Sequence, residues 1–189
     1  MKILLAEQFR NVSYSLSLIL SKQGEVDVVY DGAQALERLT NGPYDLLITE
    51  IDIPRVSGET LVKLAASRGI KVKTIGILPF SEVTEKDLSD GYGMDALIPK
   101  PFAAGDLSDL VKDLSEENEE DERFSFVQRR LLRRLQSDSS LSVGQLRKTL
   151  PETFGSIYAL VRSINSKLET TGEKRRIIFD DSGYKVVNV

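Results

Sequence analysis

The sequence predicts an α/β domain with a doubly wound, five-stranded parallel sheet, followed by a small α+β domain. Short apolar runs alternate with helix-period segments through residues 1–115, a pattern typical of parallel strands joined by helical crossovers. A charged run without any apolar residue follows at residues 116–122. From residue 123 onwards the pattern changes to three amphipathic helices and a terminal hairpin, which indicates a second domain.

Strand and helix patterns alternate strictly in the first domain. Strands are expected over residues 2–6, 26–30, 46–50, about 72–78, and from 95 to the residue before Lys100. Helices are expected over residues 11–22, 31–40, 59–67, about 84–91 and about 104–114, with Asp31 as the cap of the second helix. The uninterrupted apolar run Leu46, Leu47 and Ile48 favours a central strand that is buried on both faces.

The second domain follows the acidic run, which we interpret as a solvated linker; the absence of Gly and Pro also allows a helical extension of the first domain. Helices are expected over residues 124–137, 142–150 and 156–168, and strands over 175–179 and 184–187. In the first of these helices the apolar positions share one face, and the opposite, exposed face carries Arg129, Arg130, Arg133 and Arg134. Three helices and a hairpin form the plan of a winged helix-turn-helix, whose third helix is placed for the major groove of DNA.

Composition excludes several classes of chemistry. The chain has no Cys and no His, which excludes disulfides, thiol catalysis and imidazole general bases. No apolar run approaches the roughly 20 residues of a membrane span, so a soluble cytoplasmic protein is expected. The net charge of -4 is uneven, because residues 122–189 hold 13 Lys or Arg against 7 Asp or Glu, and residues 1–121 hold 12 against 22. Such a balance is typical of a regulatory domain joined to a nucleic-acid-binding domain.

Two charged side chains are placed at the same edge of the predicted sheet. Glu50 ends the strand in YDLLITEIDIP, and Lys100 ends the later strand in DALIPKPF. The carboxyl ends of parallel strands meet at one edge, where ligands and chemistry are found in open α/β sheets. The sequence therefore predicts that this carboxylate and this ammonium face each other.

These two stretches resemble the receiver domain of two-component response regulators, which has a flavodoxin-like fold. The whole chain resembles the OmpR/PhoB type, a receiver followed by a winged-helix output domain, because of FSFVQRRLLRRL, LSVGQLRKTL, SIYALVRSINSKLE and RRIIFDDSGYKVV. The resemblance implies a receiver at residues 1–115, an acidic linker at 116–122 and a winged-helix DNA-binding domain at 123–189. The four-stranded platform that usually opens such an output domain is not expected, because only the linker precedes the first helix.

The resemblance also implies a phosphoacceptor pocket, which is degenerate in this chain. Its positions are Glu7, Gln8, Glu50, Asp52, Pro79, Leu97 and Lys100. The family has an aspartate as phosphoacceptor where this chain has Glu50, and a pair of acidic metal ligands where it has Glu7 and the neutral Gln8. A hydroxyl and an aromatic switch are replaced by Pro79 (or Leu78) and Leu97, and only Lys100 with its following proline matches fully. Magnesium binding is therefore not expected, and no other cofactor is implied.

Phosphorylation is not expected at this pocket. The extra methylene of Glu50 spoils the geometry of in-line attack, but it lets the carboxylate reach Lys100 and imitate the charge of an aspartyl phosphate. We therefore expect a receiver held in one state; the alternative is a leftover ion pair with no signalling role. An enzyme or a receiver phosphorylated on Asp52 is disfavoured, because Asp52 lies two residues beyond the strand end.

A second set of candidate residues belongs to the expected DNA-binding surface. These positions on the output helices and hairpin are Arg147, Lys148, Tyr158, Ala159, Arg162, Ser163, Asn165, Ser166, Lys167, Lys174, Arg175 and Arg176. At the wing tip, Asp180 and Asp181 would repel a DNA backbone. The predicted function is a phosphorylation-independent, DNA-binding transcriptional regulator. The alternative is a protein-interaction adaptor whose winged helix binds a partner such as a subunit of RNA polymerase.

The family also implies a homodimer. Its usual dimer face comprises the fourth helix, fifth strand and fifth helix of the receiver, where this chain has Met94, Asp95, Lys112 and Asp113. The expected partners are thus double-stranded DNA and a second copy of the chain, with RNA polymerase as a further candidate and no membrane.

Overall fold

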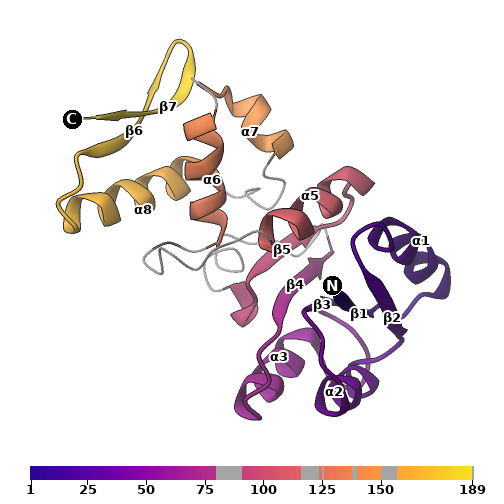
Figure 1. The fold of residues 1–189 in the computed structure, drawn as a ribbon. Helices are drawn as coiled ribbons and strands as arrows, with labels where there is room; N and C mark the ends of the chain where they lie inside the picture. The colour runs from indigo at the N-terminus through magenta and orange to yellow at the C-terminus, as the bar shows by residue number, and fades with distance from the viewer. Residues whose placement is uncertain (80–90, 116–123, 125, 138–139, 150–156, 189) are drawn as a thin grey trace. The chain divides into compact units, whose positions relative to one another are not determined.

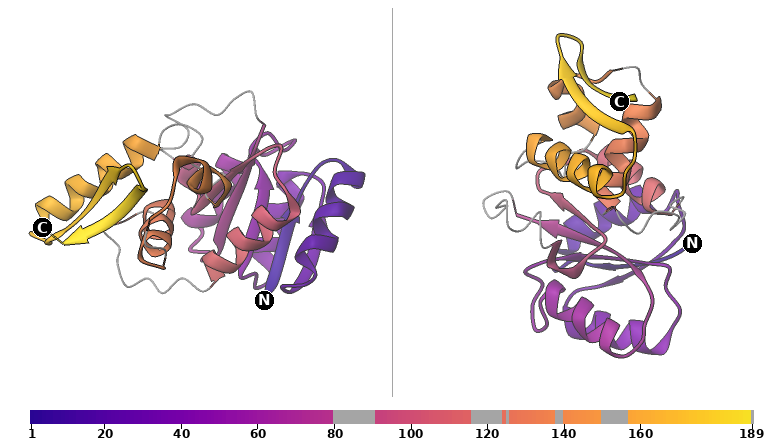
Figure 2. Two further views of the ribbon diagram at one scale, coloured as in Figure 1. Left: turned by 90° about the horizontal axis from the view of Figure 1, so that it is seen from above. Right: turned by 90° about the vertical axis from the view of Figure 1, so that its left-hand side faces the viewer.

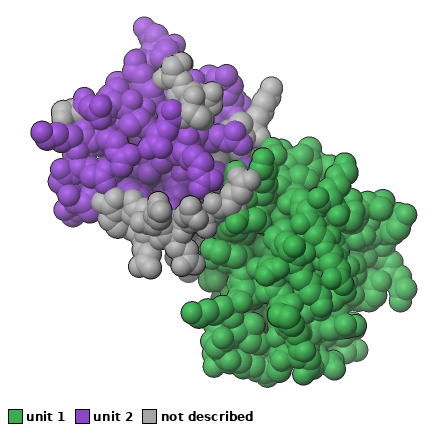
Figure 3. All heavy atoms as spheres, in the orientation of Figure 1, with its two compact units in different colours: residues 1–115 green, residues 116–189 purple. Residues whose placement is uncertain are grey.

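The computed structural model describes residues 1–79, 91–115, 124, 126–137, 140–149 and 157–188. The chain divides into two compact units, Met1–Ser115 (unit 1) and Glu116–Val189 (unit 2), which are coloured separately in Figure 3. The predicted linker at 116–122 and most of the helix expected at about 84–91 lie outside the described residues. Gly91, the last residue of that helix, instead begins the short 3-10 helix η2 (Gly91–Gly93).

Unit 1 contains the predicted five-stranded parallel sheet. Its strands are β1 (Lys2–Ala6), β2 (Glu25–Val29), β3 (Leu46–Glu50), β4 (Lys73–Leu78) and β5 (Ala96–Pro99), in the order β2-β1-β3-β4-β5. The central strands β1 and β3 pair in parallel register, and their apolar residues are almost completely inaccessible to solvent. This burial on both faces explains why these strands are continuous apolar runs rather than alternating ones.

Helices cover both faces of this sheet, as Figures 1 and 2 show. They are α1 (Arg10–Leu20), α2 (Gly32–Asn41), α3 (Gly58–Ser67) and α5 (Ala104–Ser115). The helix α1 packs against α5 on one side, and α2 packs against α3 on the other. Asp31 caps α2 by accepting a hydrogen bond from the Gln34 backbone N–H at 2.9 Å, as predicted. The doubly wound architecture predicted from the sequence is confirmed.

The described residues of unit 2 form three helices and a hairpin. Its elements are α6 (Phe126–Ser137), α7 (Val143–Thr149), α8 (Ile157–Thr170), β6 (Arg175–Asp180) and β7 (Gly183–Asn188). The unit has its own core, in which Leu131, Ile164 and Leu168 are fully buried. The segment before α7 forms a bridge that the sequence analysis did not predict, because Leu141 and Tyr184 exchange two backbone hydrogen bonds of 2.8 and 2.9 Å.

The bridge depends on a glycine at the start of β7. Gly183 has a φ of 116°, and a Cβ atom there would lie 2.5 Å from the Leu141 carbonyl oxygen. Next to the bridge, Ser142 caps α7 with a capping box. Its hydroxyl accepts a hydrogen bond from the Gln145 N–H, and the Gln145 side chain accepts one from the Ser142 N–H.

One sequence expectation about α6 is wrong. The arginines of this helix do not form a uniformly exposed face, because Arg130 is only 2% exposed, whereas Arg133 is exposed. The buried surface of α6 is wider than the leucine stripe and also includes Gln128. The long aliphatic part of an arginine side chain can pack along such a surface.

Candidate functional site

Three charged side chains meet at the carboxyl edge of the sheet in unit 1. Lys100 follows β5, Glu50 ends β3, and Glu7 directly follows β1. The Lys100 Nζ donates a hydrogen bond to Glu50 Oε1 at 2.7 Å and another to Glu7 Oε2 at 3.2 Å. The predicted contact between Glu50 and Lys100 is therefore confirmed. The ion pair with Glu7 was not predicted.

Burial makes this cluster electrostatically strong. The side chain of Glu7 is completely buried, that of Glu50 is 12% exposed, and that of Lys100 is 32% exposed. The remaining carboxylate oxygens accept backbone hydrogen bonds, Glu7 Oε1 from the Phe9 N–H at 2.8 Å and Glu50 Oε2 from the Gln8 N–H at 3.5 Å. Hydrogen bonds between charged groups are the stronger class of protein hydrogen bonds. Both carboxylates thus already have partners within the chain.

The protonation of the cluster follows from the same contacts. Burial raises the pKa of the Glu7 carboxyl, and the nearby charge of Glu50 adds to this rise. Burial alone would lower the pKa of Lys100, but the hydrogen bond and charge of Glu50, followed by those of Glu7, raise it above its ordinary value. Lys100 therefore stays charged at neutral pH, and one ammonium is shared between two carboxyl groups.

The other predicted pocket residues do not add functional groups to this cluster. Asp52 is exposed in the turn after β3, and Pro79 is half-buried just after β4. Leu97 is 4% exposed and belongs to the apolar core. Gln8 contributes its backbone N–H. Within the described ranges, no group of three or more acidic, His or Cys side chains could hold a metal ion.

The loop after β3 is fixed by contacts that sequence reasoning missed. The Gly32 N–H donates to the Pro54 carbonyl at 3.1 Å, and Arg55 forms an ion pair with Asp31 at 3.4 Å. Burial would raise the pKa of Asp31, but the hydrogen bonds from Gln34 and the charge of Arg55 lower it. The cap of α2 is thus also an anchor for the loop that follows Glu50. Only the acidic cap itself could have been recognised from the sequence.

A second candidate surface lies on α8 in unit 2. Tyr158 is 68% exposed, and Arg162 and Ser166 are also exposed. Ser163 and Lys167 are instead bonded to Gln128 of α6, with the Gln128 Nε2 donating to Ser163 Oγ at 2.9 Å and Lys167 Nζ donating to Gln128 Oε1 at 2.7 Å. The side chains of Arg147, Lys148 and Ala159 lie outside the described part of the chain.

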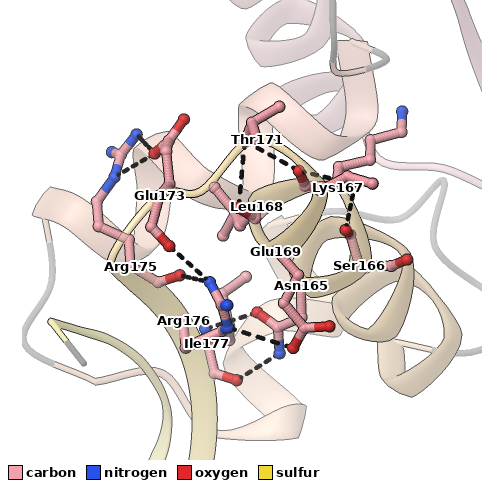
Figure 4. Close-up of polar contacts among 11 residues, drawn as sticks. Asn165, Ser166, Lys167, Leu168, Glu169, Thr171, Glu173, Arg175, Arg176 and Ile177 are labelled. Atoms are coloured by element: carbon pink, nitrogen blue, oxygen red, sulfur yellow. Dashed lines mark hydrogen bonds and ion pairs between the residues drawn. The ribbon is translucent and has the colours of Figure 1, made fainter.

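Asn165 is directed at the hairpin. Figure 4 shows its side-chain amide against Ile177 of β6, where Nδ2 donates to the Ile177 carbonyl and Oδ1 accepts from the Ile177 N–H, both at 2.8 Å. Both hydrogen-bonding atoms of this amide are therefore used within unit 2. The helical spacing alone had placed Asn165 on the outward face.

The basic residues before and within β6 are largely paired. Arg175 donates two hydrogen bonds to Glu173 Oε2, at 2.6 and 3.0 Å. Arg176 donates to the Glu173 and Arg175 carbonyl oxygens, and its Nε lies 3.4 Å from Glu169 Oε1 (Figure 4). Lys174 is exposed. The positive charge that this segment offers to a partner is therefore smaller than the sequence suggests.

The wing tip is less acidic than the sequence suggests. Asp180 forms an ion pair with Lys185 at 2.5 Å and accepts hydrogen bonds from the N–H and hydroxyl of Ser182. These hydrogen bonds from Lys185 and Ser182 hold the pKa of Asp180 below its ordinary range. The neighbouring Asp181 is exposed. One of the two carboxylates that would repel a DNA backbone is thus compensated locally.

Comparison with known proteins identifies the class of unit 1. A five-stranded parallel sheet covered by helices on both faces, with charged residues at its carboxyl edge, defines a doubly wound α/β domain. Residues 3–112 match the family described as response regulator receiver domain, and the chain belongs to that family. None of the helices in the described part of the chain is long and apolar enough to cross a membrane.

Relatives with similar sequences are named as transcriptional regulators. The chain is 30% identical to the transcriptional regulatory protein CutR of Streptomyces coelicolor over 115 residues. This alignment covers 60% of this chain and 53% of CutR. The chain is also 30% identical over 108 residues to the transcriptional regulatory protein DltR of Streptococcus agalactiae, covering 57% and 48%. The chain thus spans about half the length of these relatives.

Solved structures share the fold of unit 1. The receiver domain of the Francisella response regulator 1452 matches with a TM-score of 0.55 and 23% identity, covering 60% of this chain and 94% of that one. A CheY-like receiver domain protein from Methanospirillum hungatei matches with a TM-score of 0.54 and 24% identity, covering 61% and 94%. At these identities the likeness establishes the receiver fold alone.

Proposed function

We propose that the protein is a phosphorylation-independent response regulator that binds double-stranded DNA through unit 2 and regulates transcription. The independence from phosphorylation is supported by the ion pairs that Lys100 forms with Glu50 and Glu7. In the family, the lysine at the position of Lys100 binds the phosphoryl group on the phosphorylated aspartate. Here its ammonium already has two carboxylate partners, so the cluster holds internally the charge contact that phosphorylation would otherwise create.

Transfer of a phosphoryl group to this edge is disfavoured by the same geometry. The Glu50 carboxylate is directed at Lys100, and displacing a nucleophile by about 1 Å from the line of attack can cost a hundredfold in rate. The magnesium ion that the family implies does not fit, since Lys100 engages the two carboxylates and Gln8 is neutral. We accordingly expect no cofactor and no enzymatic activity.

The order of elements in unit 2 supports DNA binding. Helix α6, the Leu141 bridge, α7, α8 and the hairpin β6–β7 follow one another as in a winged helix-turn-helix, in which the helix corresponding to α8 reads the major groove. Arg162 and Ser166 lie on the exposed side of α8, and both side chains can bond base edges or phosphates. The relatives named as transcriptional regulators favour the same reading.

A second candidate function is a protein-interaction adaptor. It is favoured by the neutralised arginines Arg175 and Arg176 and by apolar side chains on the hairpin, of which Ile178 is 39% and Phe179 is 62% exposed. Exposed aromatic residues of this kind are enriched at protein interfaces. A subunit of RNA polymerase or another regulator is the partner that we expect under this alternative.

We also propose homodimerisation through the receiver, whose expected face the structure describes only at β5 and α5. Met94 is 9% exposed and belongs to the core, so it offers little surface to the dimer face that the sequence suggested. The carboxylate of Asp95 accepts hydrogen bonds from the N–H and hydroxyl of Thr74. Of the predicted set, Lys112 on α5 is exposed and Asp113 is half-buried.

The DNA-binding function can be tested by measuring fluorescence anisotropy of labelled genomic fragments at several salt concentrations. Genome-wide capture supplies the fragments, and the variants are Arg162→Ala on α8 and Arg133→Ala, an exposed control on α6. Losing a base or phosphate contact should weaken binding by about tenfold in Arg162→Ala, whereas Arg133→Ala should bind like the wild type. Binding that is absent, or insensitive to salt, would instead favour the adaptor.

A further inference from the structure

Each edge of the hairpin in unit 2 is hydrogen-bonded to another segment at one residue, and the two contacts differ in kind. On the β7 side, the Tyr184 N–H and carbonyl pair with the backbone of Leu141. On the β6 side, the Ile177 N–H and carbonyl pair with the side-chain amide of Asn165. The amide takes the place that a neighbouring strand would otherwise fill. A side chain of α8 thus becomes part of the small sheet.

A second contact lies one helical turn further along the same side of α8. Asn165 and Glu169 are four residues apart, a spacing that places both on one helix face. The Glu169 carboxylate lies 3.4 Å from Arg176 Nε, and the Arg176 guanidinium also bonds the carbonyl oxygens of Glu173 and Arg175 (Figure 4). Neighbouring residues of β6 are therefore held by successive turns of α8.

We propose that Asn165 is a positioning residue that fixes the hairpin against α8, so that helix and wing meet a DNA duplex as one rigid surface. The residue type suits this role, because an amide carries a donor and an acceptor in one plane. Aspartate retains only the acceptor, and alanine retains neither. Asn165 acts through the hairpin and would not itself read a base.

This role rests on the proposed DNA binding, because rigidity matters only if both elements touch the same partner. The helix and the wing of a winged helix-turn-helix contact different parts of the duplex, and their spacing must fit it. A complex forms less readily when only a fraction of the molecules hold the required orientation, and the apparent affinity falls by that fraction. Fixing the orientation in the free protein removes this loss.

The orientation can be measured without DNA. The sequence has no cysteine, so Ser166→Cys on α8 and Asp181→Cys at the wing tip give two specific spin-label sites, both of them exposed. Electron–electron distance distributions are then compared between the wild-type background, Asn165→Ala and Asn165→Asp. The control is Gln136→Ala, which removes an exposed amide from α6. Circular dichroism verifies that each variant is folded.

We expect a narrow distribution in the wild type and in Gln136→Ala, a distribution at least about twice as wide in Asn165→Ala, and an intermediate width in Asn165→Asp. Unlabelled Asn165→Ala should bind DNA about tenfold more weakly than the wild type. If Asn165→Ala does not fold, Asn165→Asp carries the test in the same direction. Unchanged widths in both variants would overturn the positioning role whether or not DNA is bound. If the wild-type protein shows no salt-sensitive DNA binding, the proposed DNA-binding function is overturned instead.

Discussion

Replacing Lys100 by methionine should expose the energetic cost of the charged cluster. Methionine keeps most of the aliphatic stem but removes the ammonium, and it leaves Glu7 and Glu50 facing each other without a cation. Removing one partner of a buried ion pair typically costs about 3–5 kcal/mol. Lys100 is 32% exposed, so we expect the lower end, about 3 kcal/mol of the free energy of unfolding. At about 4 °C per kcal/mol, the melting temperature of unit 1 should fall by about 12 °C.

The loss should depend on pH in a defined direction. Glu7 has a pKa raised above its ordinary value of 4.5 by burial, and it should rise further when the ammonium is removed. A carboxyl with a raised folded-state pKa contributes its stability below the unfolded value, and this contribution is lost as the pH rises through the folded-state pKa. The deficit of Lys100→Met should therefore shrink as the pH is lowered from neutral toward 4.5.

Urea and thermal unfolding of the full chain, followed by circular dichroism, provide the assay. The matched control is Lys63→Met on α3, whose ion pair with Glu59 is exposed and should contribute less than about 0.5 kcal/mol. If Lys100→Met is no more destabilising than Lys63→Met, the cluster is not a stabilising contact, and its engagement of Lys100 cannot explain a receiver held in one state.

Two further predictions concern the start of α3, which lies close to the backbone of Glu50, and the wing. Gly58→Ala would place a Cβ atom 2.5 Å from the Glu50 carbonyl oxygen, so it should lower the free energy of unfolding by about 1–3 kcal/mol. The control is Gly105→Ala on α5, where a Cβ atom meets nothing within 4 Å, and it should be neutral or stabilising by up to about 1 kcal/mol. If both variants change the free energy of urea unfolding equally, the close approach of Gly58 to the Glu50 backbone is refuted. At the wing tip, Asp181→Asn removes an exposed negative charge and should raise DNA affinity about fivefold at low salt. Asp52→Asn, an exposed charge of unit 1, should leave the anisotropy titration unchanged, and a similar gain in both would contradict a wing contact.

The fold of the receiver and the pairing of two charged residues at its edge could be predicted from the sequence, because both follow from the order of the strands. Parallel strands deliver their ends to one edge, so Glu50 and Lys100 could be paired from their positions in two apolar runs. The contribution of Glu7 was harder to predict. As the first residue after β1 it was considered only as a metal ligand, and its contact with Lys100 depends on side-chain conformations that periodicity does not describe.

The candidate surface of unit 2 was predicted less well, for a physical reason. A helical wheel places Asn165 among outward polar residues, but its partner is the backbone of Ile177, and backbone groups leave no trace in a hydrophobic pattern. The same limit applies to Arg130, whose polar end conceals an aliphatic stem that can be buried. Met94 likewise belongs to the core although its position in the family suggested a surface.

The central claim can be tested most directly by DNA-binding isotherms of the protein before and after treatment with acetyl phosphate and Mg²⁺. A receiver whose Lys100 is already engaged by Glu50 and Glu7 should need no phosphoryl group. We predict saturable, salt-sensitive binding by the untreated protein, with the same affinity and the same intact mass after treatment. Binding that appears only after treatment, together with the mass of an added phosphoryl group, would contradict the claim.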